Sequence, residues 1–461
     1  MTDLIPALDA LRALNPPQQP VYDDPARVDE VVSQLRRLPP LVFAGECDDL
    51  KARLAQAAAG KAFVLQGGDC AETFDTVTAA SIQRRLRVLL SMGVVLTYAA
   101  EVPVIKIGRM AGQYAKPRSK PTETRGGVEL PAYRGDAVNG FDFTPESRRP
   151  DPDRLLRAYY ASAATLNLVR AFVKGGFADL RAMHSWNADF VRKAHVSARY
   201  EQLTGEIDRA LAFMATIGVD GGEAFRTVDF WASHEALLID YEHALTRIDS
   251  RTALPYNVGG HLLWVGERTR LPGGAHAELL KRLRNPLGIK AGPNANPDDI
   301  LRLADELDPA HEPGRLMVIT RLGADRVRSV LPPLVNAMEA TGRKVVWVCD
   351  PMHGNTFESG TGYKTRSFAD VTAELDGFFD VHAELGTWPG GVHFELTGDD
   401  VTECVGGAAD VSVDDLANAY ETVCDPRLNR QQSLELAFMV ADRLSHLEHA
   451  SRRAPVMPDV L

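Results

Sequence analysis

The strongest constraint on the fold of this chain is a set of eight short apolar runs, most of them separated by segments with helical patterning. Alternation of buried strands with helices is typical of a parallel sheet built from βαβ units. Eight such units favour a closed (β/α)8 barrel, whose active site lies at the carboxyl ends of the strands. The predicted strands are residues 62–66, 104–108, 226–231, 262–265, 287–289, 316–320, 345–349 and 391–394.

Almost every run leads into charged, hydroxyl or thiol residues. In a closed barrel the carboxyl ends of all strands meet at one mouth, so residues at those ends belong to one site. The pattern therefore predicts a single polar site rather than scattered surface charges. In strand order, the residues that follow the runs are Cys70; Arg109; Ser233, His234 and Glu235; Glu267 and Arg268; Lys290; Arg321; Asp350 and His353; and Glu395.

Composition narrows the class of partner. Of the 461 residues, 51 are Lys or Arg and 62 are Asp or Glu, which gives a net charge of −11 and disfavours nucleic-acid or anionic-membrane partners. No apolar stretch approaches the roughly 18 residues of a membrane span. The amino terminus shows no export signal, and five scattered cysteines fit a reducing compartment. We therefore expect a cytoplasmic protein with small-molecule substrates.

The chain divides into three parts on these patterns. Residues 1–45 form a Pro-rich amino-terminal arm, residues 46–449 the catalytic barrel, and residues 450–461 a tail without a structural pattern. An unusually long connection joins the second and third strands, since loops in compact domains are short. It contains an inserted helical region, 141–222, whose surplus helices serve packing on one reading and regulation or assembly on another. The helices predicted along the chain are 9–14, 48–59, 79–98, 153–174, 186–193 and 198–217, with a last one beginning at Asn429.

Four cations follow four of the predicted strands: Arg109, Arg268, Lys290 and Arg321. Arginine matches carboxylate and phosphate oxygens with a planar fork, and lysine adds a point charge. Any one of them could instead pair with a neighbouring acid such as Glu267. Four cations in one mouth repel one another unless an anion lies among them, so the set favours a ligand with both phosphate and carboxylate groups.

A second cationic element follows the second strand, in the segment Lys116-Pro-Arg-Ser. The two cations and the hydroxyl of Lys116, Arg118 and Ser119 suit a second phosphate or a polyol, although a short solvated loop is equally compatible. Lys364 and Arg366 lie in a further cationic segment, and here we favour a solvated surface loop.

A mixed set of metal-ligand types comes from the ends of the first, seventh and eighth strands and the loop after the eighth. Cys70, His353, Glu395 and Asp425 offer sulfur, nitrogen and oxygen donors, and the eighth strand of a barrel adjoins the first. Such a set suits a borderline divalent ion rather than Ca²⁺ or Mg²⁺. A structural role for the same residues is equally compatible with their spacing. His393 shares a strand face with Glu395 and could support the ligands from behind.

Longer stretches around these residues resemble type II 3-deoxy-D-arabino-heptulosonate 7-phosphate (DAHP) synthases, the first enzymes of the shikimate pathway. The similarity extends from about Lys61 to Val440 in the family's order. The matching stretches are Gln66-Gly-Gly-Asp-Cys-Ala-Glu, Gly112-Gln-Tyr-Ala-Lys-Pro-Arg-Ser, Tyr133-Arg-Gly-Asp, Ser233-His-Glu-Ala-Leu, Trp264-Val-Gly-Glu-Arg-Thr-Arg, Asp350-Pro-Met-His-Gly-Asn-Thr, Val401-Thr-Glu-Cys and Cys424-Asp-Pro-Arg-Leu-Asn.

The resemblance implies condensation of phosphoenolpyruvate with erythrose 4-phosphate and water, with release of phosphate. It implies one divalent metal ion, with Mn²⁺ or Co²⁺ favoured over Zn²⁺ or Fe²⁺. Lys290, Glu267 and Arg109 would then be catalytic, with Glu267 orienting or deprotonating the attacking water. The implied phosphoenolpyruvate site is Arg109, Glu267, Arg268, Lys290 and Arg321; the erythrose 4-phosphate site is Lys116, Arg118 and Ser119; the metal ligands are Cys70, His353, Glu395 and Asp425.

The inserted helices resemble those of the long, regulated members of this family. That similarity implies a homodimer or homotetramer, aromatic amino acids as effectors and a chorismate mutase as a further partner. Three other interpretations compete with it: another metal-dependent sugar-phosphate aldolase or hydrolase on a barrel, a secondary-metabolism copy of the same synthase, and an inactive effector sensor.

Overall fold

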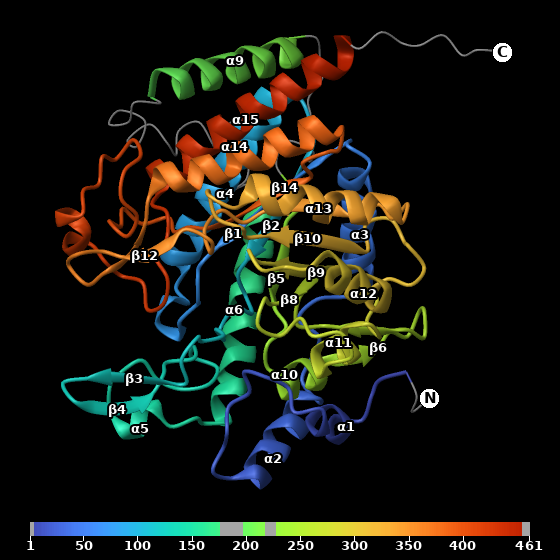
Figure 1. Cartoon of the computed structure of the whole chain (residues 1–461), viewed down its shortest axis with the longest axis vertical. Helices are drawn as coiled ribbons and strands as arrows, with labels where there is room; N and C mark the ends of the chain where they lie inside the picture. Colours follow the sequence, from blue (N-terminus) through green and yellow to red (C-terminus); the bar gives the residue numbers. More distant parts are fainter. Residues whose placement is uncertain (1–3, 176–196, 217–226, 454–461) are drawn as a thin grey trace.

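A computed structural model describes residues 4–175, 197–216 and 227–453. Eight parallel strands close into a barrel in the order β1-β14-β11-β10-β9-β8-β5-β2, with helices between them (Figure 1). The predicted (β/α)8 fold is therefore confirmed. The barrel strands are β1 (Phe63–Gly68), β2 (Val104–Arg109), β5 (Trp231–Glu235), β8 (Leu262–Val265), β9 (Leu287–Ala291), β10 (Leu316–Thr320), β11 (Val346–Cys349) and β14 (Gly391–Glu395).

The third barrel strand lies later in the chain than predicted. The prediction covered 226–231, whereas β5 spans Trp231–Glu235, so the polar residues lie within the strand and not after it. Ser233 tolerates this position because its Oγ accepts a hydrogen bond from Gln66 Nε2 at 2.9 Å and donates one to Gly108 O at 3.1 Å. Apolar patterning cannot detect a strand whose buried polar groups are satisfied by neighbouring strands.

Side chains alternate between two apolar layers along each barrel strand. Val64 and Ile105 belong to an inner cluster with Leu50 of α3 (Ala44–Ala58), which lies against the amino-terminal ends of the strands. Phe63 and Leu65 face outward and pack against the surrounding helices. The period of two along a strand explains how one run of apolar residues contributes to both layers. The barrel interior near the amino-terminal ends of the strands is thus filled with apolar side chains, and the polar site lies at the carboxyl ends.

The helical layer contains α4 (Ala79–Ala100), α10 (Ile239–Ala244), α11 (Ala275–Leu280), α12 (Pro297–Leu307), α13 (Val327–Ala340), α14 (Phe368–Leu385) and α15 (Arg430–Arg453). α15 packs along α4 and α14 (Figure 1). It continues to Arg453, through the first residues of the predicted tail. Residues 454–461 lie outside the described residues.

The helix α6 (Asp153–Lys174) has the predicted bounds and packs against α4 in the helical layer. The helix α9 (Ser197–Thr216) is an addition that lies along α15, where Arg199 pairs with Asp442 (Figure 1). The predicted helix 186–193 falls outside the described residues. The smaller elements are η1 (Phe74–Thr76), β3 (Thr122–Arg125), β4 (Val128–Pro131), α5 (Pro145–Arg148), β6 (Thr246–Ile248), β7 (Pro255–Asn257), β12 (Thr356–Glu358), β13 (Lys364–Arg366) and η3 (Asp414–Asn418).

The amino-terminal arm is helical and packed. α1 (Leu8–Ala13) lies one residue from the predicted position, and α2 (Pro25–Leu35) was not predicted. α2 begins at Asp24, whose carboxylate caps the helix by accepting a hydrogen bond from Arg27 N at 3.1 Å. The buried faces of both helices join a cluster that includes α10 and α6. The arm is therefore part of the globular unit. No helix among the described residues is both long and apolar enough to cross a bilayer.

Candidate active site

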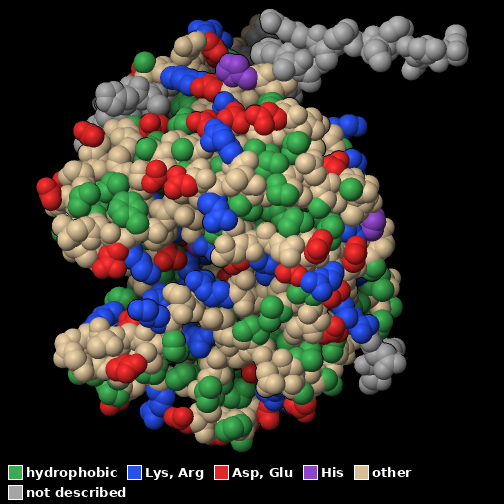
Figure 2. All heavy atoms as spheres, viewed as in Figure 1, with side chains coloured by type: hydrophobic (Ala, Val, Ile, Leu, Met, Phe, Trp, Pro, Cys, Tyr) green, Lys and Arg blue, Asp and Glu red, His purple; other side chains and the backbone are tan. Residues whose placement is uncertain are grey.

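A cavity of about 390 Å³ lies at the carboxyl ends of the barrel strands. Figure 2 shows it as a cleft on the left, with Lys and Arg side chains gathered around it. The structure brings all of the residues predicted for the site to this cavity. Ten of them line it, and the other two are buried directly behind lining residues. Its lining includes Arg109, Lys116, Arg118, Ser119, Glu267, Arg268, Lys290, Arg321, His353 and Asp425, and the buried Cys70 and Glu395 contact lining residues.

Strand register explains why distant segments meet here. β1 lies between β14 and β2, and Gly68 is the register partner of both Glu395 and Arg109. Cys70 follows two residues later, so its thiol lies over the junction of these three strands. The carboxyl ends of parallel strands share one edge, which brings together residues more than 300 positions apart.

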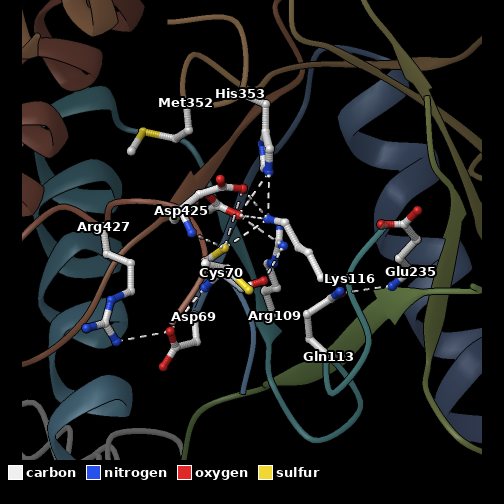
Figure 3. A network of polar contacts seen from close by, with 12 residues as sticks. Asp69, Cys70, Arg109, Gln113, Lys116, Glu235, Met352, His353, Asp425 and Arg427 are labelled. Carbon is white, nitrogen blue, oxygen red and sulfur yellow. Dashed lines mark hydrogen bonds and ion pairs between the residues drawn. The ribbon is translucent and has the colours of Figure 1, made fainter. Parts of the chain in front are cut away.

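The four predicted metal ligands surround the ammonium group of Lys116 (Figure 3). Its Nζ lies 2.8 Å from Cys70 Sγ and 2.8 Å from Asp425 Oδ2. It lies 3.1 Å from Glu395 Oε1 and 3.4 Å from His353 Nε2. One cation thus contacts every member of the sulfur, nitrogen and oxygen set. A set that already binds a monovalent cation at its centre has the charge and the orientation to hold a divalent one.

The donor set also fits a metal on chemical grounds. Ligand atoms of Cys70, Glu395 and Asp425 all lie within 4.8 Å of one another, and His353 Nε2 is 2.9 Å from Glu395 Oε1. Asp350 Oδ2 is 2.7 Å from His353 Nδ1, an arrangement that leaves Nε2 directed toward the set. Thiolate, imidazole and carboxylate together suit Mn²⁺, Fe²⁺, Co²⁺ or Zn²⁺. These residues therefore fit the group that the resemblance implies.

Opposite charges at close range set the protonation of this cluster. Burial acts to lower the pKa of Lys116, but Asp425, Cys70 and Glu395 outweigh it and raise that pKa. Burial acts to raise the pKa of Asp425, yet Lys116 and Arg366 hold it well below its usual range. Burial raises the pKa of Cys70, reinforced by a hydrogen bond with Cys424. The cluster at neutral pH is then an ammonium, two carboxylates and a thiol, and metal binding would release the thiol proton.

Arg109 is the most enclosed of the four strand-end cations. Its Nη2 donates to Cys70 O at 2.7 Å and lies 3.0 Å from Glu395 Oε1, while its guanidinium lies 5.5 Å from the centre of the Trp264 ring. His393 Nε2 lies 2.9 Å from Arg109 Nη1. His393 therefore supports Arg109, with no hydrogen bond to the four ligands among the described residues.

Lys290 pairs with Asp350, the residue that also bonds His353. Burial lowers the pKa of Lys290 to about 8, because the attraction of Asp350 offsets only part of the cost of burying the charge and Arg109 lowers it further. Asp350 is 0% exposed and connects a predicted phosphoenolpyruvate residue to a predicted metal ligand. The sequence pattern places Asp350 at a strand end without indicating a role. Its role follows from its two partners, which only the tertiary structure brings together.

The other two cations are less constrained. Arg268 lines the cavity and makes no hydrogen bond or ion pair with the described part of the chain. Arg321 donates from Nη2 to His353 O at 2.6 Å, but its buried Nε has no partner in that part of the chain. Both retain donors that a bound anion could use.

Two acidic side chains face the cavity with different surroundings. Glu267 accepts hydrogen bonds from Arg270 Nε at 2.9 Å, Arg270 Nη2 at 2.9 Å and Gly292 N at 2.7 Å. Glu235 is the register partner of Trp264, and its Oε1 is buried without a partner among the described residues. Burial raises the pKa of Glu235 although Arg109 and Lys116 act against it. Glu235 was noted as a strand-end residue without a role, and its unengaged oxygen makes it the better proton acceptor.

Arg366 contradicts our preference for a solvated surface loop, whereas Lys364 is exposed as that preference predicts. Arg366 is 0% exposed and donates from Nη2 to Glu395 Oε2 at 2.7 Å. Lys364 lines the cavity, with Nζ 3.5 Å from Asp425 Oδ1. The β12–β13 hairpin folds both cations over the metal-ligand set, which the loop-like composition of their segment could not indicate.

The second cationic element also lines the cavity. Arg118 donates from Nη2 to Glu123 Oε1 at 3.2 Å, and Ser119 is exposed beside it.

Beneath the site, Arg427 bonds Glu403 Oε1 at 2.7 Å and Asp69 Oδ1 at 3.1 Å. Asp69 precedes Cys70 in the chain, so this buried network holds the backbone segment that carries Cys70.

Comparison with known proteins identifies the family of this chain. A profile of the Class-II DAHP synthetase family matches residues 7–441. A Streptomyces coelicolor protein named phospho-2-dehydro-3-deoxyheptonate aldolase is 61% identical over 431 residues, 94% of this chain and 96% of its own length. A Mycolicibacterium smegmatis protein, phospho-2-dehydro-3-deoxyheptonate aldolase AroG, is 50% identical over 443 residues, 95% of this chain and 94% of its own length. The matched region contains every strand of the barrel and every residue of the cavity, and the chain belongs to the Class-II DAHP synthetase family.

Proposed function

We propose that this chain condenses phosphoenolpyruvate with D-erythrose 4-phosphate and water to give DAHP and phosphate, the first step of the shikimate pathway. Membership of the Class-II DAHP synthetase family supports this reaction. The structural observation that carries it is one cavity that contains a sulfur, nitrogen and oxygen donor set together with the cations of both predicted cationic elements. Two anionic substrates and a metal ion that share one site require such a combination of donors and cations.

Phosphoenolpyruvate is assigned to the strand-end cations. Its carboxylate and phosphate would be held by Arg109, Arg268, Lys290 and Arg321, all of which line the cavity. The free donors of Arg268 and Arg321 support this assignment. The phosphate of erythrose 4-phosphate would be held by Arg118 and Ser119, which line the same cavity, and Lys116 of the same segment lies among the metal-ligand donors.

A divalent ion held by Cys70, His353, Glu395 and Asp425 would supply Lewis acidity at the aldehyde oxygen. Mn²⁺ and Co²⁺ are the ions that we favour. The enzyme's own groups serve the carbon–carbon bond formation by orientation and charge. The Lys116 ammonium is a hydrogen-bond donor for the alkoxide that develops when C3 of phosphoenolpyruvate attacks the aldehyde.

Water then adds to C2 of the former phosphoenolpyruvate, and its proton needs an acceptor. We assign that proton to Glu235, whose Oε1 is unengaged in the described structure, and an orienting role to Glu267, whose oxygens accept from Arg270 and Gly292. The C2–O bond to the phosphate then breaks, the C2 hydroxyl passes its remaining proton to the departing phosphate, and a ketone is left at C2. The other proton of the water ends on the former aldehyde oxygen, which becomes a hydroxyl. Arg268, Lys290 and Arg321 stabilise the charge on that leaving group.

Finer features of the family are proposed on membership alone. They are a homodimer or homotetramer, aromatic amino acids as effectors, a chorismate mutase partner and a cytoplasmic location. The free state of all five cysteines supports a reducing compartment. The additional helix α9, which lies along α15, supplies surface for assembly or regulation.

Phosphate release tests the function directly. The metal-loaded chain should release phosphate from phosphoenolpyruvate only when erythrose 4-phosphate is present, with stoichiometric DAHP. Phosphate release from either substrate alone would instead support a hydrolase on the same barrel. Absence of turnover with every metal in a Mn²⁺, Co²⁺, Fe²⁺ and Zn²⁺ series would contradict the synthase and favour an inactive sensor.

A further inference from the structure

The turn after α1 contains two consecutive glutamines, Gln18 and Gln19, between prolines at 16, 17 and 20. Gln18 has a φ of 65°, which is uncommon for a residue other than glycine. Both side chains are partly buried. The prolines restrict this segment before folding, so its position costs less conformational entropy than that of a flexible loop.

Each glutamine amide bonds the backbone of a different segment that follows a barrel strand. Gln18 Oε1 accepts from Arg118 N at 2.9 Å, and Gln18 Nε2 donates to Arg118 O at 3.2 Å. Gln19 Oε1 accepts from Ile239 N at 3.0 Å, and Gln19 Nε2 donates to Leu237 O at 2.8 Å. The first loop follows β2 and carries the second cationic element. The other follows β5, which ends at Glu235.

Arg134 ties the two glutamines to the same region. Its guanidinium donates to Gln18 O at 2.6 Å and to Gln19 O at 3.2 Å. Its backbone oxygen accepts a hydrogen bond from Lys116 N at 2.9 Å. The turn therefore contacts the backbone at both ends of the Lys116–Arg118 segment, directly at one end and through Arg134 at the other.

We propose that Gln18 and Gln19 form a brace from the amino-terminal arm that positions the sugar-phosphate half of the cavity. Gln18 is a positioning residue for Arg118. With the Arg118 backbone held by Gln18 and its guanidinium by Glu123, the side chain keeps a direction toward the cavity that a free loop would not maintain. The identity of the positioned substrate rests on the proposed function.

Gln18→Met tests the brace, because methionine keeps the length of the side chain and removes both hydrogen-bonding atoms. The matched control is Gln34→Met, the same change at an exposed position of α2 in the same arm. In metal-loaded full-length enzyme, Gln18→Met should raise the KM for erythrose 4-phosphate about tenfold, as expected for the loss of the side-chain hydrogen bonds to Arg118 and Arg134. The KM for phosphoenolpyruvate should stay within about twofold of the parent value, and Gln34→Met should match the parent in both.

Amide hydrogen exchange provides a readout that needs no substrate. The Arg118 amide should exchange about tenfold faster in Gln18→Met, and the Ile239 amide should do so in Gln19→Met, because each loses its acceptor. Unchanged exchange in both variants would overturn the brace. Faster Arg118 exchange with an unchanged KM for erythrose 4-phosphate would overturn its positioning role. If the parent enzyme turns over no substrate, the proposed function fails, and amide exchange alone decides whether the brace exists.

Discussion

The Nζ atom of Lys116 lies 2.8 Å from the Sγ atom of Cys70, at the centre of the donor set that would hold a metal ion. The same nitrogen contacts Glu395 and Asp425. A residue assigned to the sugar-phosphate substrate is therefore also the internal counter-ion of the metal ligands. Metal binding must displace or repel this ammonium, which couples the metal site to the second substrate.

Lys116→Met should bind Mn²⁺ more tightly than the parent chain, by about tenfold or more, because it removes a positive charge that competes for the same donors. Two unit charges about 4 Å apart interact by about 4 kcal/mol at an effective dielectric constant of about 20, so tenfold is a conservative expectation. Isothermal titration calorimetry with Mn²⁺ would measure it. Lys116→Arg keeps the charge and should show no such gain; weaker binding in the methionine variant would contradict the coupling.

Phosphoenolpyruvate binding should weaken as pH rises through about 8, because the buried Lys290 has a pKa of about 8, below its ordinary value of 10.5, and binds anions only when charged. Between these two values the unfolded chain holds a proton that the folded chain has lost, so this group's contribution to folding stability rises with pH there. Fluorescence or calorimetric titration of phosphoenolpyruvate across this range would measure the binding change.

Lys290→Arg is the control for this pH dependence, because arginine stays protonated throughout that range. Its affinity for phosphoenolpyruvate should be lower overall but nearly independent of pH. A parallel decline in both proteins would assign the titration to another group. Lys290→Ala should lose activity by orders of magnitude while remaining folded.

Glu235→Gln should reduce kcat by about 10²–10⁴-fold, the usual contribution of a general base, with small changes in either KM. Glutamine retains the shape of glutamate but cannot accept the proton of the attacking water. Glu267→Gln is the comparison, since the Glu267 carboxylate already accepts from Arg270 and Gly292. Steady-state kinetics over a pH series should show a larger loss of kcat for Glu235→Gln. The reverse order would return the role of base to Glu267.

Glu403→Ala should destabilise the protein by about 3–5 kcal/mol, because it removes one carboxylate from the buried Arg427 network. The side chains of Glu403 and Arg427 are 0% and 8% exposed, so water cannot replace the lost partner well. Urea or thermal unfolding would measure the change. Arg302→Ala breaks an exposed pair with Asp299 and should cost about 0.5 kcal/mol or less. Equal effects of the two substitutions would contradict the importance of burial.

The barrel itself was predictable because its signal is local. Each strand is a short run of apolar residues, and β8 and β10 have the predicted bounds. The third strand was predicted too early because Ser233 and His234 are polar yet buried in β5, and each bonds a partner on another segment. Helix α2 was missed because its Pro-rich surroundings concealed an amphipathic pattern whose apolar face is buried by α6 and α10.

The sequence also indicated which residues belong to the site. Cys70, Arg109, Lys290 and Glu395 stand at or just beyond strand ends, and closure of a parallel barrel brings such positions to one mouth. Neither helical nor strand periodicity contains information about which side chains contact one another there. The order of residues along the chain could therefore identify which side chains lie at the site, but not which of them contact one another.

Only the tertiary structure decided those partners. The central position of Lys116, the burial of Arg366 against Glu395, and the pairing of Gln18 with the Arg118 backbone each join segments that are far apart in the chain. Such contacts depend on side-chain directions and on the desolvation of charges in a closed cavity. Local sequence determines which elements form and where they end, whereas packing determines which charges meet and which are left free for a substrate.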